Sequence, residues 1–281
     1  MMDVVGFETS SRLIDMLSPV ANAYADSAGQ RAMQEAELDA SRSALGERHP
    51  ITLKARNNLG TTLRSQGCLV QARELLESTL HDCRRVLGKK HPDTLTAMNN
   101  LAIALCEEGD LARALVLQKK VLKWRRQMLG VEHPNSLVAM VNLSVTRGAL
   151  GDHAGARELD ETVLEIRLRN LGENHPATLA ALGNLAATIN NQAVALRNNG
   201  NLIDAEPLQM EAVALMTKVY GADSLHVAST YSATGALLKL TGEPEKARTY
   251  FCKALEIRER ELGPDAELTL LVRARLREML H

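Results

Sequence analysis

Leucine and alanine recur at fixed positions along the chain and predict pairs of helices. In each pair, a first segment of about 16 residues and a second of similar length flank a glycine, and a large aliphatic residue repeats at one position of each segment. Because leucine and alanine favour helix, each pair of segments is expected to form a helical hairpin whose leucines fill the space between hairpins. The repeating leucines are Leu63, Leu105, Leu196 and Leu238 in first segments and Leu80, Leu122, Leu164 and Leu255 in second segments.

A connector of the form Leu-Gly-x-x-His-Pro separates successive hairpins. Its first four glycines are 42 residues apart, the next follows after 49 residues and the last after another 42. A fixed period of this length is the signature of a solenoid. The histidine or its neighbour is expected to cap the next helix, proline to occupy its first turn and glycine to close the preceding helix. The connector glycines are Gly46, Gly88, Gly130, Gly172, Gly221 and Gly263.

Small residues mark the places where the two helices of a hairpin are expected to approach most closely. Each turn glycine is followed five residues later by alanine, and a small residue stands opposite on the first helix. A methyl group is about the largest side chain that permits the short end of the ~8–10 Å range of helix separations. The alanines are Ala72, Ala114, Ala156, Ala205 and Ala247, and the facing residues are Gly60, Ala102, Ser144, Ala193 and Gly235.

This arrangement of small residue, turn glycine and alanine resembles the tetratricopeptide repeat. The 42-residue unit, with Leu-Gly-x-x-His-Pro-x-Thr-Leu and Asn-Asn-Leu, resembles the kinesin-light-chain subclass of that family. The resemblance implies an all-α fold, a right-handed α-solenoid of about five helix-turn-helix hairpins. It does not identify a partner, since this subclass occurs in many adaptor and signalling proteins.

Three segments are expected along the chain. Residues 1–45 are predicted to form a degenerate N-terminal helical pair, and residues 46–263 the repeat array, with units that start near residues 46, 88, 130, 172 and 221. Residues 264–281 are predicted to form a C-terminal cap helix. An alternative is that the apolar stripe of this last helix pairs with a second copy of the chain, which would make a homo-oligomer. The stripe comprises Leu268, Leu271, Val272, Leu276 and Met279.

Two hairpins depart from the repeat. Seven extra residues lie between Leu179 and Gly200, and because seven residues are nearly two helical turns, the first helix of that unit should lengthen without rotating its contacts. In the third unit, Arg147 and His153 replace leucines of the other units, which predicts a locally looser hairpin.

Composition excludes several classes of partner. The net charge of −1 supplies no field to attract nucleic acid or an anionic membrane, and an aromatic content of 2% leaves few rings on which bases can stack. The first 17 residues lack the continuous apolar core of a signal peptide, and no run approaches the roughly 18 apolar residues of a membrane span. Four scattered cysteines suggest neither a zinc site nor a disulfide framework. We therefore expect a cytoplasmic protein with no nucleic-acid or membrane partner.

The sequence predicts no enzyme. It contains no phosphate-binding glycine loop, no His-Glu-x-x-His and no Gly-x-Ser-x-Gly. The connector histidines belong to repeats about 20 Å apart, so they cannot share one metal ion. Arginines near the ends of second helices, such as Arg167 and Arg258, are interpreted as solvated charges that complement the helix dipole. Catalytic, cofactor and metal-binding residues are thus all expected to be absent.

Asparagines that recur on first helices are the candidates for ligand binding, because asparagine is a mediocre helix former with no packing reason to repeat. The family resemblance implies that first helices line a concave groove whose asparagines contact the backbone of an extended peptide. The alternative is that one asparagine of each pair bridges neighbouring helices. The predicted groove residues are Lys54, Asn57, Asn58, Thr61, Arg64, Asn99, Asn100, Ile103, Asn142, Asn184, Asn190 and Asn191.

Taken together, these features predict a non-enzymatic scaffold that binds an extended peptide or a partner protein in the groove. One alternative is a regulatory or sensor module of a larger signalling protein of the NTPase type. Another is a structural repeat protein that assembles with itself.

Overall fold

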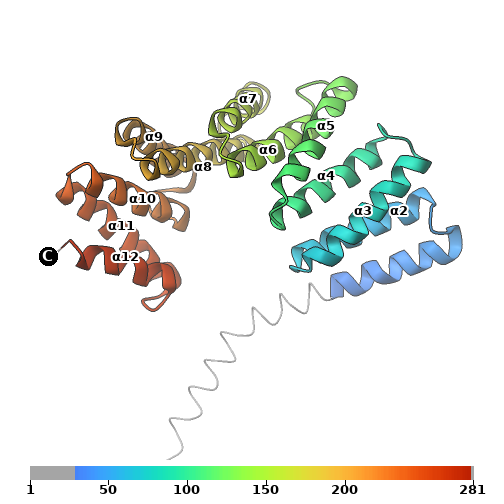
Figure 1. Ribbon diagram of the computed structural model, residues 1–281, viewed down its shortest axis with the longest axis horizontal. Helices are drawn as coiled ribbons and strands as arrows, with labels where there is room; N and C mark the ends of the chain where they lie inside the picture. The colour runs from blue at the N-terminus through green and yellow to red at the C-terminus, as the bar shows by residue number, and fades with distance from the viewer. Residues whose placement is uncertain (1–28, 280–281) are drawn as a thin grey trace, which may run out of the picture. The chain divides into compact units, whose positions relative to one another are not determined.

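A computed structural model describes residues 29–279, and helices dominate it throughout (Figure 1). The all-α prediction is confirmed, since the described residues contain helices and turns and no strand. A helix over residues 29–45 precedes the first full hairpin, and the rest of the predicted N-terminal pair, residues 1–28, lies outside the described residues. The first helices of the hairpins are α2 (Pro50–Ser65), α4 (Pro92–Glu107), α6 (Pro134–Ala149), α8 (Pro176–Asn198) and α10 (Leu225–Leu240). The second helices are α3 (Leu69–Val86), α5 (Leu111–Leu129), α7 (His153–Leu171), α9 (Leu202–Tyr220) and α11 (Pro244–Leu262), and α12 (Glu267–Arg277) follows.

The chain divides into two compact units, which meet in sequence between Arg125 and Arg126. In the first unit, α2 packs against α3, α3 against α4, and α2 also touches α4. In the second unit, each helix from α6 to α12 packs against the next in sequence, and the first helix α8 also touches α6 and α10. Each unit is therefore built of consecutive helical hairpins, and its first helices are neighbours.

The helix lengths follow the predicted repeat. Four of the first helices have 16 residues, and α8 has 23. The seven additional residues of that unit therefore extend the helix, as predicted, and do not form a loop.

The connector histidines cap the helices that follow them. In each case Nδ1 accepts a hydrogen bond from the backbone N–H two residues later, at 3.0–3.3 Å. The proline that comes next occupies the first turn, where its missing N–H leaves no hydrogen bond unmade. This role explains the repetition of histidine without any metal. The four capping residues are His49, His91, His133 and His175.

In three connectors, a buried hydroxyl of the first helix bonds a carbonyl at or near the end of the preceding second helix. The Thr94 hydroxyl donates to the Cys83 carbonyl at 3.3 Å, and the Ser136 hydroxyl donates to the Gly130 carbonyl at 2.7 Å. The Cys83 carbonyl lies in the last turn of α3 and also accepts the backbone N–H of Leu87, and the Gly130 carbonyl lies just after the end of α5. The Thr/Ser position of the motif thus contributes to the connection between one hairpin and the next.

Arginines near the ends of second helices strengthen the same joint. Arg167 donates to the Ala177 carbonyl at 2.7 Å, and Arg258 donates to the Leu268 carbonyl at 2.9 Å. The interpretation of Arg258 as a solvated charge is wrong, because the residue is only 5% exposed. Its guanidinium carries enough donors to bond a backbone carbonyl while the aliphatic stem is buried.

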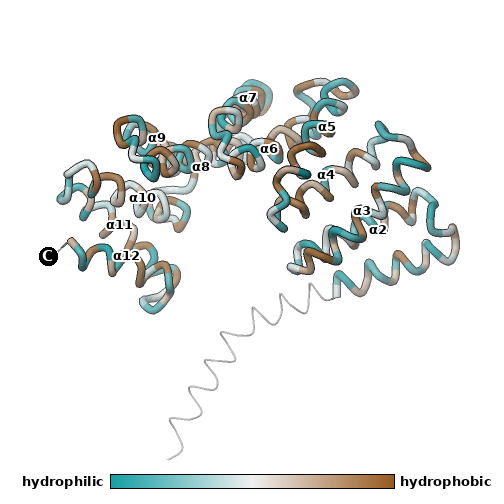
Figure 2. Tube along the Cα trace, viewed as in Figure 1, coloured by the Kyte–Doolittle hydropathy of each residue, from teal (hydrophilic) through white to brown (hydrophobic). Residues whose placement is uncertain are grey.

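The predicted hairpin contacts form the core of each pair. All five turn-adjacent alanines are completely buried. The approach is tight enough that a Cβ added at Gly60 would lie 2.7 Å from Leu76 Cδ2, and one added at Gly235 would lie 2.9 Å from Phe251 Cδ1. Figure 2 shows hydrophobic and hydrophilic residues interspersed along the helices.

The last helix, α12, packs against α11 of the second unit. Val272 is fully buried, and Leu276 and Met279 pack against the core cluster that contains Phe251. Leu271 remains 47% exposed, so only part of the predicted apolar stripe is covered.

The hairpin contact generates a stability prediction. Ala114→Leu should insert a branched side chain at a fully buried site and lower the free energy of unfolding by about 1–3 kcal/mol. Ala112→Leu, at an exposed position of the same helix, is the matched control and should change it by less than about 0.5 kcal/mol. Urea unfolding of both variants measures the difference, and equal effects would contradict the assigned contact.

Candidate peptide-binding groove

Three of the predicted groove residues gather in the first unit. Lys54, Asn57 and Asn58 of α2 face Asp93 and Thr96 of α4 across a small cavity of about 90 Å³. Asp93 and Lys54 supply one negative and one positive charge to its lining. The volume suits a small polar group and is well below the ~300–1,000 Å³ typical of ligand pockets.

The other predicted residues of the first unit bond mainly within the protein. The Asn100 amide donates to Asn57 Oδ1 at 3.1 Å and so joins two neighbouring first helices. Arg64 forms an ion pair with Glu107, and the Thr61 hydroxyl donates to the Asn58 carbonyl. Asn99 is 7% exposed, and Ile103 is half-buried. The bridging alternative therefore describes the Asn57–Asn100 pair.

A larger pocket, of about 340 Å³, lies between α6 and α8 in the second unit. Two residues of α7, His153 and Asp160, also line it. Val145 is 64% exposed and Asn191 is also exposed, so the pocket opens to solvent. We call it the α6–α8 pocket. Its lining residues are Ser144, Val145, Gly148 and Ala149 of α6, His153 and Asp160 of α7, and Asn184, Ala187, Thr188 and Asn191 of α8.

Two predicted asparagines, Asn184 and Asn191, line the α6–α8 pocket from positions two helical turns apart on α8. Asn190 instead accepts a hydrogen bond at 2.9 Å from Gln209, which is 1% exposed, so this asparagine joins α8 to α9. Asn142 is half-buried outside the pocket lining. The structure thus brings together two of the four asparagines predicted for this unit.

Asp160 is the most unusual group in the pocket, because its carboxylate is buried without a cation. The residue is 2% exposed, and its Oδ2 accepts a hydrogen bond from the Thr188 hydroxyl at 2.7 Å. The Ser144 hydroxyl also lies within hydrogen-bond reach of this carboxylate, and its single proton is donated either there or to the Ala156 carbonyl, 3.2 Å away. Burial raises the pKa of Asp160, and the hydrogen bonds from Thr188 and Ser144 only partly oppose that rise.

The third hairpin is also where the sequence departs from the repeat. His153 lines the α6–α8 pocket, and its buried Nδ1 has no hydrogen-bond partner within the described residues. Arg147 turns away and donates to the Gly155 carbonyl at 3.1 Å. Replacing two leucines with these polar residues removes apolar packing at the position where the pocket lies.

Sequence reasoning missed Asp160, Thr188 and the part played by Ser144. A signal for Asp160 was present in the repeat itself. The residue four places after the hairpin alanine is buried in every hairpin, and in the first, third and fifth hairpins it lies against the small residue of the first helix. That position holds Leu76, Gln118, Asp160, Gln209 and Phe251, so an ionisable side chain occupies it in one of the five hairpins.

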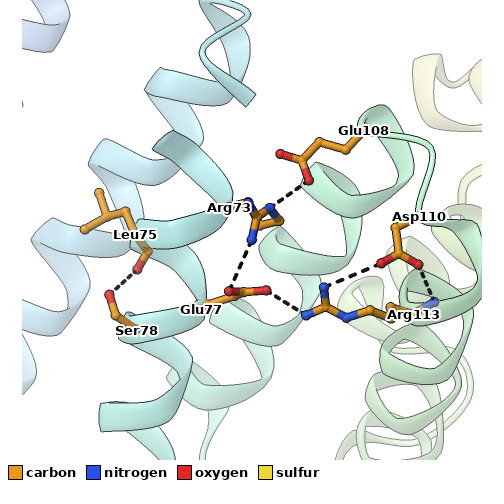
Figure 3. A network of polar contacts seen from close by, with 7 residues as sticks. All are labelled: Arg73, Leu75, Glu77, Ser78, Glu108, Asp110 and Arg113. Carbon is orange, nitrogen blue, oxygen red and sulfur yellow. Dashed lines mark hydrogen bonds and ion pairs between the residues drawn. The ribbon is translucent and has the colours of Figure 1, made fainter. Parts of the chain in front are cut away.

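A second hollow, of about 590 Å³, lies in the first unit between the second helices α3 and α5, with Leu101 of α4 beneath. Its charged residues Glu77 and Arg113 pair with one another at 2.6 Å. Figure 3 shows that Arg73 and Asp110 extend this pairing into a network of charged side chains. Because these charges pair with one another, this hollow offers less unpaired charge to a charged ligand than the α6–α8 pocket does.

Other site types find no support in the described part of the chain. No group of three or more His, Cys, Asp and Glu side chains within residues 29–279 is arranged to hold a metal ion. Over the same residues, no helix combines the length and the apolar character needed to cross a membrane. The four cysteines are free thiols, of which Cys83 is buried and Cys252 exposed.

The buried carboxylate generates a pH-dependent prediction. Because the pKa of Asp160 is raised on folding, the native state holds this proton more tightly than the unfolded state, and stability falls as pH rises from about 4 toward the raised value. Each unit of elevation costs about 1.4 kcal/mol. Asp160→Asn should therefore gain stability relative to the parent chain as pH increases from about 4 to 7, as measured by urea unfolding. A stability difference that stays constant over this range would contradict the assignment.

Comparison with known proteins agrees with this architecture. A tetratricopeptide repeat model matches residues 52–127, 99–169, 136–189 and 186–260. A search of curated proteins found no match.

Solved structures share the fold at low sequence identity. Putative kinesin light chain repeats from Podosopora anserina are 24% identical, with a TM-score of 0.57 over 75% of this chain and 97% of that one. BtubC (BKLC) from P. vanneervenii is 18% identical, with a TM-score of 0.60 over 84% and 92%. The apo quorum sensor NprR from B. thuringiensis is 16% identical, with a TM-score of 0.64 over 97% and 77%. With family models that span most of its length and with kinesin-light-chain-like repeat structures among its neighbours, the chain belongs to the tetratricopeptide repeat family.

Proposed function

We propose that this protein is a non-enzymatic interaction scaffold that binds an extended peptide along its first helices. The observation that carries the proposal is the α6–α8 pocket, which opens between two neighbouring first helices and is lined by Asn184 and Asn191. An asparagine side chain offers both a donor and an acceptor, so it can bond a peptide backbone whatever the side chains of that peptide.

The family supports the same general role, since tetratricopeptide repeats are commonly modules for binding proteins. In the first unit, Lys54 and Asn58 supply further polar contacts on a first helix. Asn57, Asn100 and Asn190 are assigned to the framework, because their side chains bond other helices of the same protein. The proposed contact residues are thus fewer than the sequence pattern suggested.

The proposal includes a cytoplasmic location. Its support is the state of the four cysteines, which are free thiols, as proteins in a reducing compartment generally keep them.

Peptide selection tests this function. A display library of random extended peptides is selected on the parent chain, and the recovered peptides are titrated against Asn184→Ala/Asn191→Ala. Each lost hydrogen bond is worth about 0.5–1.5 kcal/mol, so binding should weaken about five- to a hundredfold.

The matched control is Asn174→Ala/Asn198→Ala, which removes two exposed asparagines outside the pocket. Circular dichroism checks that all variants keep their helicity. If the library yields no binder, or if the pocket variant binds as tightly as the parent, the proposal is wrong.

Self-assembly through the last helix is a second candidate, favoured by the exposure of Leu268, Leu270 and Leu271 at 46–49%. Leu271→Glu should then convert an oligomer to a monomer without loss of helicity, as read by light scattering. Ile203→Glu, which changes an 86% exposed residue of α9, is the control and should leave the oligomeric state unchanged. A parent chain that is monomeric at high concentration excludes this candidate.

A further inference from the structure

We infer that the α6–α8 pocket receives a basic side chain, arginine or lysine, of the bound peptide, with Asp160 as its counter-ion. This inference rests on the proposed function and specifies which ligand residue the pocket selects.

The fold does not require a charge at Asp160. The equivalent position holds leucine in the first hairpin, phenylalanine in the fifth and glutamine in the second and fourth, and all of them are buried. An apolar or neutral residue therefore fills the space facing the small residue of the first helix. Burying a carboxylate there costs stability that either alternative would avoid.

No basic side chain of the described residues neutralises this carboxylate. Its contacts are with the hydroxyls of Thr188 and Ser144. Arg147, next to the lining residue Gly148, is engaged elsewhere, with its guanidinium bonded to the Gly155 carbonyl and 3.5 Å from Asp152. A buried carboxylic acid either keeps its proton or ionises beside a cation, and since no cation of the described residues faces Asp160, a basic ligand group is the partner that would stabilise its ionised form.

The remaining lining residues match the shape of a long basic side chain. Val145, Ala149 and Ala187 provide apolar surface for an aliphatic stem. The buried Nδ1 of His153 lacks a partner and, in a neutral ring, can accept a hydrogen bond. Asn184 adds an amide oxygen.

These acceptors suit the donors of an ammonium or guanidinium group, which has no acceptor of its own. A carboxylate offers about four lone-pair sites, and two hydroxyls can occupy at most two of them. Volume agrees as well, since the pocket, at about 340 Å³, has room for one side chain.

Direct titration with small probes tests the pocket without any assumption about the peptide. N-acetyl-arginine amide and N-acetyl-lysine amide are added to the ¹⁵N-labelled full chain, and the side-chain amide signals of Asn184 and Asn191 are followed by NMR. At least one probe should give saturable shifts. The citrulline analogue keeps the shape of arginine but carries no charge, so it should bind about tenfold more weakly or worse.

Two variants make this titration decisive. Asp160→Asn should abolish the saturable shifts while the chain stays folded, and Asp265→Asn, which neutralises an exposed acid outside the pocket, should leave them unchanged. Citrulline binding as tightly as arginine, or Asp160→Asn retaining full affinity for the probe, would overturn the inference.

The selected peptides provide a second and independent measurement. They should share one basic residue at a fixed position, and its replacement by norleucine should weaken binding to the parent about thirtyfold or more. In Asp160→Asn, the same replacement should change affinity less than twofold.

The outcomes separate the two proposals. Peptides that depend on Asn184 and Asn191 but share no basic residue would support the groove and overturn the basic-residue inference. A saturable arginine shift without any selected peptide would support the cation pocket and overturn the peptide groove. Failure of both measurements would overturn both.

Discussion

Every hairpin of this protein depends on the close approach of its two helices at one pair of small residues. The hairpin alanine is fully buried in all five hairpins, and added atoms at Gly60 or Gly235 would collide with the facing side chain. Because the helices are held so near, the position one turn after the alanine is necessarily buried. An uncommon residue at that position, such as Asp160, is therefore buried between the two helices.

Hydrogen bonds at the connectors add to the apolar core that is shared between hairpins. A histidine caps each of four first helices, and at three of these connectors a buried Thr or Ser bonds a carbonyl at or near the end of the preceding second helix. An arginine near the end of that second helix bonds the following one, as Arg167 does with Ala177. Helix ends carry backbone groups without partners, so this set of contacts satisfies them and fixes the spacing of the repeat. The connector motif is therefore a structural device, and its repetition reports on packing and not on ligand binding.

The proposed binding pocket lies where the repeat is broken. In the third hairpin, polar residues replace leucines at Arg147 and His153, and aspartate occupies the position that is apolar or neutral elsewhere. His153 and Asp160 both line the pocket of this hairpin. On the inference drawn above, the buried carboxylate selects a basic ligand group, and the hairpin exchanges stability for specificity, a common relation between the framework of a protein and its binding site.

The sequence by itself determined the helical hairpins, their period, the lengthened α8 and the buried alanines, because these follow from local propensity and from spacing along one chain. It also indicated first helices as the face that carries recurrent asparagines. Only the tertiary structure decided which asparagines are available. Asn57 and Asn100 bond each other, Asn190 bonds Gln209, and Asn184 and Asn191 line a pocket. Side chains that look equivalent in a repeat differ because their partners come from neighbouring helices, and those partners are set by packing between distant segments, which periodicity does not encode.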